Sequence, residues 1–548
     1  MCPEFQVHTT MRDLSPFQAG HFDVCVIGAG VYGAACAHSL AAAGLKTAVI
    51  DKGDFCSATS ANSLKILHGG LRYLQHGNLV RMRETIRARR EFMRFAPHLS
   101  KALACAIPTF GSGLRSPLAA RCATLLNNAI GSDRNLGIAG DLALPPGRTI
   151  SRESFLQQFP GTTVPGLSGG LVWYDTLAGN TERLVLEYLW AARDLGALPC
   201  NYLRAERILT QNGRVEGVLV TDVPSGQPFA INASWVVNAA GPWFDELLEA
   251  SGIPPVPTRW TKAVNIVVRR ELNPDCAVGI ESNEEYSDQD AVLKRNKRFY
   301  FFVPWRGGTL IGTSYKEWRG SREDLLPTRA DTEEIVREVQ AIHPSWGLEP
   351  KDVSFAHAGL LPMSGIDASG AVQLAKHSLI VDHGKTGGPQ GLLSLRSIKY
   401  TTAPVEADKV TAIILRDTGR RPARQPAPAQ GQGRVPAELA PLLHSRYGSR
   451  APRVAGHLAA ADSDTWWLSR EPPLLRAELR YFIQEEMALH LTDVLFRRTG
   501  LGSLRCPPAG LLTTLAEAMA AELGWDGARQ QLEIEQVMRR FAMLPQEN

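Results

Sequence analysis

Apolar runs and helical periodicities alternate along the chain before residue 417. The run 22–30 (FDVCVIGAG) is typical of a buried strand, and the small residues of 31–45 (VYGAACAHSLAAAGL) are typical of a helix that lies close to a sheet. A second apolar strand follows at 46–53 (KTAVIDKG). This order predicts a β-α-β unit with two parallel strands.

Three further segments extend this pattern. Residues 233–243 and 376–384 read as strands that are separated by long insertions. Residues 293–315 alternate in polarity and predict an antiparallel hairpin, with its turn at Arg306, Gly307 and Gly308. The pattern therefore predicts an α/β fold, in which a Rossmann-like nucleotide-binding domain carries an inserted antiparallel β-rich substrate domain.

The character of the chain changes near residue 417. Pro, Gly, Gln and Arg dominate 417–436, which predicts a linker. Beyond it, residues 477–500 carry apolar side chains at close to a 3.6-residue period and predict a helix with Gly500 as its C-cap. The predicted organisation is an N-terminal extension (1–20), a main domain (21–416), the linker (417–436) and a C-terminal helical domain (437–548).

Composition and charge indicate an ordinary globular protein. The 548 residues are 44% hydrophobic and 21% charged, and a net charge of +4 is too mild for a dedicated nucleic-acid binder. The nine cysteines are scattered without C-x-x-C pairs, and the histidines have no metal-ligand spacing, so we expect neither a disulfide framework nor a metal site. This cysteine usage favours a reducing compartment.

Targeting and membrane-spanning patterns are not evident in the sequence. Residues 1–20 contain no apolar run followed by a cleavage site, and no stretch reaches the ~18–20 apolar residues that cross a bilayer. We expect a cytoplasmic protein with at most peripheral contact at the inner membrane. Residues 78–99, with six arginines and two glutamates between Arg81 and Arg94, predict a solvated helix, or alternatively a basic rim that meets anionic lipid.

Three glycines mark the turn of the β-α-β unit. Gly28, Gly30 and Gly33 follow a strand and open a helix, and Asp51 lies about 20 residues further on. Such glycines allow a pyrophosphate to approach the helix N-terminus, where free N–H groups favour anions. The acid accepts hydrogen bonds from a ribose. NAD and FAD both use this geometry, so the motif predicts a dinucleotide without choosing between them.

The segment that follows favours FAD. Residues 51–77 form a long run of small and hydroxylic residues that ends in a second glycine pair, Gly69 and Gly70. An NAD domain would enter another helix at this point, whereas such a run can pass the pyrophosphate and lie beneath a flavin ring.

Seven motifs across the chain carry a resemblance to a known family. They are GAGVYGAA (28–35), ATSANSLKILHGGLRYL (58–74), APHL (96–99), VNAAGPW (237–243), IGTSY (311–315), IKYTTA (398–403) and EMALHLTDVLFRRTGL (486–501). In these motifs the chain resembles the FAD-dependent glycerol-3-phosphate dehydrogenases, within the D-amino-acid-oxidase-like flavoproteins. The resemblance implies that residues 21–416 form a FAD-dependent oxidoreductase domain. It also implies hydride transfer from C2 of glycerol 3-phosphate to flavin N5, with electrons passed on to quinone or oxygen.

The resemblance also implies roles for individual residues. Gly28, Gly30, Gly33 and Asp51 would hold the ADP half of FAD, and Ala240 and Gly241 would pack against the cofactor. Along the pyrophosphate and flavin would lie Thr59, Ser60, Ser63, Lys65, His68, Gly69 and Gly70. The substrate pocket would contain Arg72, Tyr73, Lys399 and Thr401.

Three positions depart from the family pattern. Leu361 stands where the family has an arginine on the substrate phosphate, Asn265 where it has a candidate catalytic histidine, and Ser397-Ile398 where it has two glycines. Loss of a bidentate arginine costs on the order of 2–3 kcal/mol. Cations that could compensate are Lys262, Lys316 and Arg319.

The departures leave three questions open. The base that takes the alcohol proton is His357 or, nearer the flavin, His68. The substrate is glycerol 3-phosphate or another polyol phosphate, hydroxy acid or amine, and a non-catalytic flavoprotein subunit is the remaining alternative. The C-terminal helices either cap a monomer or form a homodimer contact.

Overall fold

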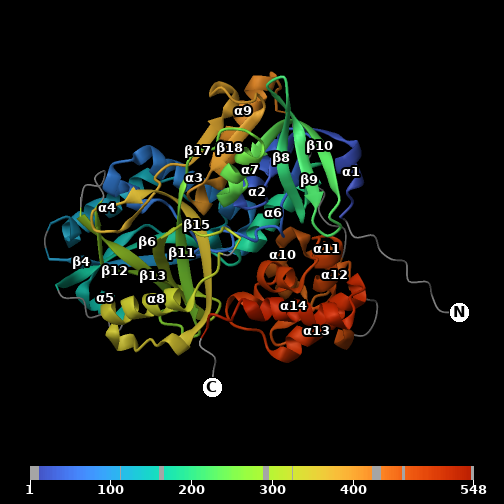
Figure 1. Ribbon diagram of the computed structural model, residues 1–548. Coiled ribbons are helices and arrows are strands. Elements are labelled where there is room, and N and C mark those ends of the chain that lie inside the picture. Colours follow the sequence, from blue (N-terminus) through green and yellow to red (C-terminus); the bar gives the residue numbers. More distant parts are fainter. Residues whose placement is uncertain are drawn as a thin grey trace.

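The protein contains two large β-sheets that lie side by side and a helical domain below the first of them, as the computed structural model shows (Figure 1). The helical domain also carries a two-stranded sheet, β19 (Trp467–Arg470) and β20 (Pro473–Leu475). The structure describes residues 12–111, 113–159, 166–287, 295–323, 325–422, 434–458 and 463–544. None of the helices in these ranges is long and apolar enough to cross a membrane.

The first sheet contains the β-α-β unit. Its strand order is β17-β18-β10-β1-β2-β7, with the β8–β9 hairpin joined to β10. Its strands are β1 (His21–Ile27), β2 (Thr47–Ile50), β7 (Leu198–Cys200), β8 (Leu203–Gln211), β9 (Arg214–Asp222), β10 (Pro228–Asn238), β17 (Leu379–Asp382) and β18 (Leu392–Arg396). β1 pairs in parallel with both β2 and β10, which confirms the predicted unit and the two further strands.

Small residues allow helix α2 to pack closely against this sheet. α2 (Val31–Ala42) runs from β1 to β2 and buries six of its residues as alanine, cysteine or glycine: Gly33, Ala34, Ala35, Cys36, Ala37 and Ala41. Small side chains let α6 (Thr181–Asp194) and α9 (Ala403–Thr418) pack directly against α2. Helix α2 is thereby held by two neighbouring helices.

The second sheet forms the inserted domain. Its order is β16-β15-β11-β14-β13-β12-β4-β6-β3, with β5 beside β6. Its strands are β3 (Ile66–Leu67), β4 (Ser100–Phe110), β5 (Arg148–Ser151), β6 (Leu167–Ala178), β11 (Arg259–Val268), β12 (Cys276–Ser287), β13 (Arg295–Trp305), β14 (Gly308–Trp318), β15 (Val353–Ile366) and β16 (Val372–Leu374). Most neighbours are antiparallel, as expected for this domain.

The predicted hairpin is β13–β14. Its two loop residues, Arg306 and Gly307, have φ angles of 53° and 77°, the left-handed pair that a two-residue hairpin turn requires. Further helices of the main domain are α1 (Ser15–Ala19), α3 (Leu79–Phe95), α4 (Pro117–Ile130), α5 (Arg152–Gln158), α7 (Phe244–Ala250) and α8 (Arg329–Ile342).

The basic helix predicted at 78–99 is α3, and several of its arginines are paired within the protein. Arg83 and Arg90 bond to Asp133, and Arg89 bonds to the buried Asp175 of β6. This helix is therefore anchored through some of its arginines, while Arg87 and Arg94 remain exposed on a solvated face as predicted.

The C-terminal domain differs from its prediction in one element. Its helices are α10 (Ala440–Tyr447), α11 (Ala451–Ala455), α12 (Arg476–Gln484), α13 (Ala509–Leu523) and α14 (Gly527–Arg539). The single helix expected over 477–500 is wrong, because the chain leaves the helix after Gln484 and turns at Met487, whose φ is 55°. A π-helical turn then runs from Asp493 to Arg498.

A buried ion pair explains this break. The Glu486 carboxylate is fully buried and accepts hydrogen bonds from Arg183 and from Trp190 Nε1 of α6. Ending α12 at Gln484 brings Glu486 onto α6 of the main domain. The same segment supplies Arg498, which bonds to the buried Asp54. These contacts join the two domains through charged side chains.

Candidate active site

A cavity of about 1530 Å³ lies between the two sheets. Pockets that enclose a drug-sized ligand span roughly 300–1,000 Å³, so this one has room for an extended cofactor and a small substrate. Its lining comes from the β1–α2 turn, from residues 51–74, from strands β11, β14 and β15, from residues 397–401, and from Arg540 at the end of α14.

The glycine turn is packed so tightly that side chains do not fit. Gly28 has a φ of 96°, and a Cβ there would lie 2.9 Å from the carbonyl carbon of Ala239. A Cβ on Gly30 would lie 2.9 Å from Ser60 Oγ, and one on Gly33 would lie 2.9 Å from the Gly28 carbonyl carbon. Gly28 and Gly30 line the cavity, whereas Gly33 lies behind them and lets α2 contact the turn.

Asp51 closes the same end of the cavity. Its Oδ2 accepts a hydrogen bond from Ala29 N at 2.7 Å, and its Oδ1 accepts one from Gly53 N at 3.0 Å. Burial raises the pKa of Asp51 to about 6, although these two hydrogen bonds act in the opposite direction. The carboxylate thus ties the glycine turn to β2 and lines the cavity where that strand ends.

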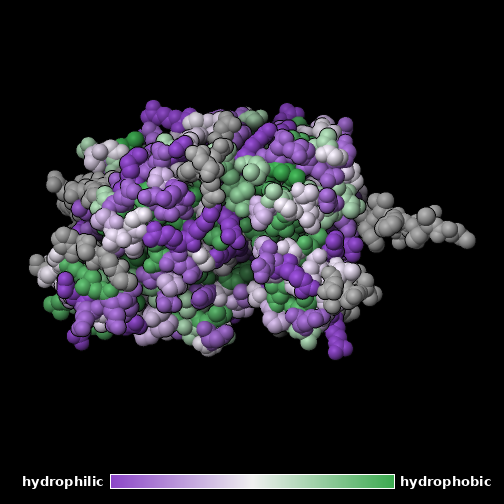
Figure 2. Space-filling view, turned by 90° about the horizontal axis from the view of Figure 1, so that it is seen from below, coloured by the Kyte–Doolittle hydropathy of each residue, from purple (hydrophilic) through white to green (hydrophobic). Residues whose placement is uncertain are grey.

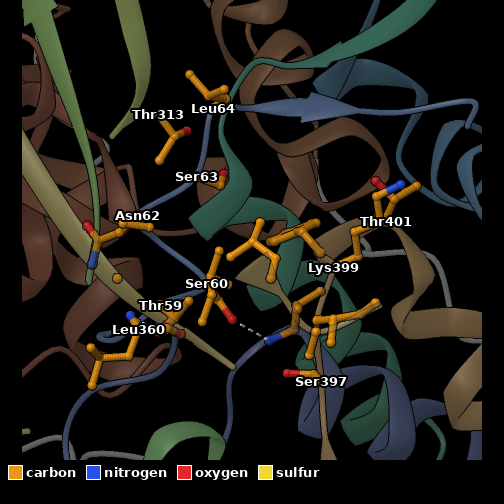
Figure 3. A pocket seen from close by; sticks show the side chains of 18 of the residues that line it. Thr59, Ser60, Asn62, Ser63, Leu64, Thr313, Leu360, Ser397, Lys399 and Thr401 are labelled. Carbon is orange, nitrogen blue, oxygen red and sulfur yellow. Dashed lines mark hydrogen bonds between the residues drawn. The ribbon is translucent and has the colours of Figure 1, made fainter. Parts of the chain in front are cut away.

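Hydroxyl side chains continue along the cavity wall. Ser60 Oγ accepts a hydrogen bond from Val31 N at the start of α2, and Thr59 Oγ1 is hydrogen-bonded to the backbone of Leu360. Figure 3 shows Thr59, Ser60 and Ser63 on one side and Lys399 with Thr401 on the other. Further lining residues among those predicted are Gly70, Ala240 and Gly241.

The predicted substrate residues come together where two loops meet. Lys399 Nζ donates to Tyr73 OH at 3.2 Å and lies 4.5 Å from the centre of that ring. His68 N donates to Thr401 Oγ1 at 3.2 Å, which joins the loops. Arg72 is the residue before Tyr73; it is exposed and lines the cavity. Two cations therefore face one region of the cavity.

His68 is held by an aspartate that no sequence pattern indicated. His68 Nδ1 lies 3.2 Å from Asp175 Oδ2, and His68 lines the cavity. Asp175 also accepts hydrogen bonds from Gly69 N at 2.6 Å and from Arg89 Nη1 at 2.8 Å. Burial opposes ionisation of Asp175, but the His68 hydrogen bond and the Arg89 charge lower its pKa below the usual range. The pair is an imidazole oriented by a carboxylate.

Five predicted residues do not line the cavity. Lys65 Nζ is buried and bonds to Glu182 at 2.8 Å, and Lys262 Nζ bonds to Asp331 at 2.6 Å. Gly33 packs against the backbone of Gly28, and Gly69 packs against the side chain of Arg89. His357 is buried, and neither of its ring nitrogens has a hydrogen-bond partner among the residues that the structure describes; burial lowers its pKa well below its usual value.

These placements correct the predicted roles of Lys65 beside the flavin and of Lys262 beside the substrate. Lys262 lies on β11 next to the cavity-lining residue Ala263, which shares a strand face with Asn265, but Lys262 projects from the opposite face, since neighbouring residues of a strand alternate. The alternative cations Lys316 and Arg319 are paired with acidic groups, including Glu334 and Glu317. They do not take the place of an arginine at Leu361, which itself lines the cavity.

Comparison with known proteins identifies the fold. Residues 23–392 match the model of a family described as FAD dependent oxidoreductase, and residues 412–530 match the C-terminal domain of alpha-glycerophosphate oxidase. The first match covers more than half of the chain. The chain belongs to the FAD-dependent oxidoreductase family. The predicted cofactor, FAD, and the predicted fold class are thereby confirmed.

Several members of the family are similar over nearly the whole chain. A glycerol-3-phosphate dehydrogenase of Synechocystis is 27% identical over 94% of this chain and 95% of its own length. Glycerol-3-phosphate dehydrogenase 2 of Mycobacterium bovis is 30% identical over 95% of this chain and 88% of its own length. The solved glycerol-3-phosphate dehydrogenase of Bacillus halodurans, complexed with FAD, shares the fold with a TM-score of 0.71, 20% identity and 98% coverage of both chains.

The residues of this FAD-dependent oxidoreductase fit the cofactor. The glycine turn leaves no Cβ between the cavity and the N-terminus of α2, which is where a pyrophosphate binds in such folds. The adjacent carboxylate and hydroxyl groups suit a ribose and a phosphate chain. No part of this donor set requires a metal.

Proposed function

We propose that the protein oxidises sn-glycerol 3-phosphate to dihydroxyacetone phosphate. The relatives named glycerol-3-phosphate dehydrogenase, similar over nearly their full length, support this substrate. FAD, when bound, supplies the redox chemistry by accepting a hydride from C2 of the alcohol at flavin N5. The observation that carries the proposal is that two cations and an oriented histidine line the same cavity as the glycine turn.

The residues that line the cavity form one region for the cofactor and another for the substrate. Gly28, Gly30 and Asp51 hold the ADP half, and the hydroxyl groups of Thr59, Ser60 and Ser63 line the path toward the flavin. Gly70, Ala240 and Gly241 also line the cavity and would pack against the flavin ring. These residues would hold the cofactor between the first sheet and the second.

His68 takes the hydroxyl proton of the substrate. Oxidation of an alcohol to a ketone releases a proton together with the hydride, so a base must receive it. Asp175 holds Nδ1 of His68, which leaves Nε2 as the basic atom. This assignment replaces His357, which is buried outside the cavity lining.

Lys399 and Arg72 attract the substrate anion. Lys399 is fixed by Tyr73, and the loop that carries it is fixed by the hydrogen bond from Tyr32 OH to Lys399 O at 2.8 Å. A fixed ammonium in this cavity would also favour the negatively charged reduced state of a bound flavin. Thr401 holds the backbone at His68 and so positions the base relative to these cations.

Anaerobic reduction of the purified, FAD-loaded protein tests this function. Glycerol 3-phosphate is expected to bleach the flavin absorbance and to yield one dihydroxyacetone phosphate per flavin. Glycerol, lactate and an amino acid serve as comparison substrates. Reduction by one of these instead would favour another substrate, an alternative that Leu361 and Asn265 at the cavity wall motivate. A flavin that no compound reduces would support a non-catalytic subunit.

The electron acceptor is proposed to be a membrane quinone reached through peripheral contact. Helix α4 exposes Leu118, Leu125 and Leu126, while its neighbour α3 carries the basic residues. Exposed apolar side chains beside arginines suit a surface that enters the headgroup region of anionic lipid. Figure 2 shows that polar and apolar residues are interspersed on the face seen from below.

Vesicle sedimentation and reoxidation test this second step. Binding to anionic but not neutral vesicles is expected, and it should fall when Leu125 and Leu126 are replaced by serine. A soluble quinone analogue should reoxidise the reduced enzyme faster than oxygen does. Faster reoxidation by oxygen would make the protein an oxidase.

A further inference from the structure

One cavity-lining residue comes from the C-terminal helical domain. Arg540 follows the last residue of α14 and lines the cavity of the main domain. Its guanidinium lies 5.4 Å from the centre of the Phe496 ring. Within the described ranges, no carboxylate, carbonyl or hydroxyl group forms an ion pair or hydrogen bond with the Arg540 side chain.

The position of Arg540 is fixed by aromatic packing. Its neighbour Phe541 is buried and packs against Phe355 of β15, with ring centres 5.5 Å apart, and against Phe496 at 6.0 Å. Phe355 and Phe496 also pack on each other at 5.8 Å. The end of α14 is thus clamped onto the second sheet, so that Arg540 is presented by a rigid support.

This clamp places Arg540 at the substrate side of the cavity. Phe355 lies two residues before His357, which pairs in register with Asn265 of β11, a cavity-lining residue. Asn265 Oδ1 accepts a hydrogen bond from Thr313 Oγ1 at 2.8 Å, so this end of the wall is polar. The glycine turn that suits the pyrophosphate belongs to the other sheet.

A partly buried guanidinium that has no acidic partner among the described residues is electrostatically unfavourable until an anion joins it. Burial and the neighbouring Arg497 lower the pKa of Arg540 to about 10, yet the group stays charged at neutral pH. Buried charges in proteins are almost always paired or hydrogen-bonded. A planar guanidinium matches the oxygens of a phosphate.

We propose that Arg540 binds the phosphate of the substrate, so that the C-terminal domain completes the active site. The inference rests on the proposed function for the identity of that phosphate. It also accounts for Leu361: the anion is held by an arginine that directly follows α14, near His357 of β15, rather than by a residue at position 361. Arg540 is a binding residue in this account and takes no part in proton transfer.

Substrate affinity of the holoenzyme measures this role. Arg540→Met is compared with wild type, with the conservative Arg540→Lys, and with Arg539→Met, which removes an exposed arginine one residue earlier. Loss of a charged hydrogen-bonding group is expected to raise the glycerol 3-phosphate concentration for half-maximal flavin reduction by roughly 10- to 100-fold. The limiting reduction rate and the FAD content should stay within about twofold. Arg540→Lys should recover part of the affinity, and Arg539→Met should behave as wild type.

Calorimetric binding of inorganic phosphate gives a readout that does not require turnover. Wild type and Arg539→Met are expected to bind phosphate, and Arg540→Met is expected to bind it at least about tenfold more weakly. If glycerol 3-phosphate does not reduce the wild-type flavin but phosphate still binds through Arg540, the proposed function fails and the anion site stands. Unchanged phosphate and substrate affinity in Arg540→Met, or loss of FAD rather than of substrate, would overturn the inference. Should Arg540→Met not fold, Arg540→Lys and Arg540→Gln are read in the same two assays.

Discussion

Gly33 offers the sharpest test of the cofactor turn because it lies behind the cavity and does not touch the ligand. In Gly33→Ala the added Cβ would lie 2.9 Å from the carbonyl carbon of Gly28 and closer still to its oxygen. Carbon atoms in contact prefer about 3.5 Å. The Gly28 carbonyl must therefore move by at least about half an ångström, and Gly28 lines the cavity.

The cost of this displacement follows from overpacking. An extra methyl group in a well-packed region costs typically about 1–3 kcal/mol. Part of that cost is relieved when the turn shifts, and a shifted turn no longer presents its N–H groups correctly to the pyrophosphate. If the whole of this free-energy cost applies to the FAD-bound protein alone, the affinity for FAD falls by roughly 5- to 150-fold.

The assay is FAD titration of the apoprotein, followed by protein fluorescence or flavin absorbance. Gly510→Ala is the matched control: Gly510 lies in α13, and a Cβ added there would meet no atom within 4 Å. This control should bind FAD as wild type does and should be no less stable, because alanine favours a helix over glycine. Equal FAD affinity of Gly33→Ala and Gly510→Ala would refute the claim that this turn carries the cofactor.

Three further predictions concern stability, pH and catalysis. Glu486→Gln removes the two-pronged partner of the buried Arg183, which then keeps only Glu187 at 3.2 Å, and should lower the free energy of unfolding by about 3 kcal/mol in urea denaturation, the low end for a broken buried pair. The partly exposed Glu485→Gln should cost less than about 1 kcal/mol; equal effects would contradict the buried pairing. The pKa of His357 is lowered in the folded state, so below about pH 6.5 the unfolded chain binds a proton that the folded protein does not. The free energy of unfolding should therefore fall by about 2 kcal/mol from pH 7 to pH 5. In His357→Leu this contribution to the pH dependence of stability should be absent. An unchanged slope in the variant would show that His357 is protonated in the fold. His68→Gln should reduce the limiting rate of flavin reduction by about 10²- to 10⁴-fold with FAD content unchanged, as measured by anaerobic stopped flow; a normal rate would exclude His68 as the base.

The sequence predicted those parts of the molecule that local patterns determine. The β1–α2–β2 unit has short apolar strands, a small-residue helix and a glycine turn in consecutive order, and each signal is complete within about 30 residues. The same holds for the β13–β14 hairpin, whose turn needs two left-handed residues. Such elements are specified by neighbours along the chain.

The parts that were missed depend on contacts between distant residues. Asp175 lies 107 residues from His68, and no spacing in the sequence links them. Arg540 reaches the cavity from another domain through the packing of Phe541, which no periodicity reveals. Lys262 illustrates a different limit: Ala263 and Asn265 share one face of β11, so strand alternation places Lys262 on the other face once the strand register is known.

The break at residues 485–492 has a similar origin. Its apolar spacing suits a continuous helix, but the Glu486 carboxylate accepts hydrogen bonds from Arg183 and Trp190 of α6. A buried charge of this kind outweighs the small helical preference of a few residues. Tertiary pairing thus decides where α12 ends.

The most direct test of the whole account is a crystal structure of the FAD-loaded enzyme, reduced by glycerol 3-phosphate under anaerobic conditions. The account predicts the pyrophosphate at the Gly28–Gly30 turn, the product carbonyl within hydrogen-bonding distance of His68 Nε2, and the phosphate on Arg540. A flavin bound elsewhere, or a product whose carbonyl faces away from His68, would contradict it.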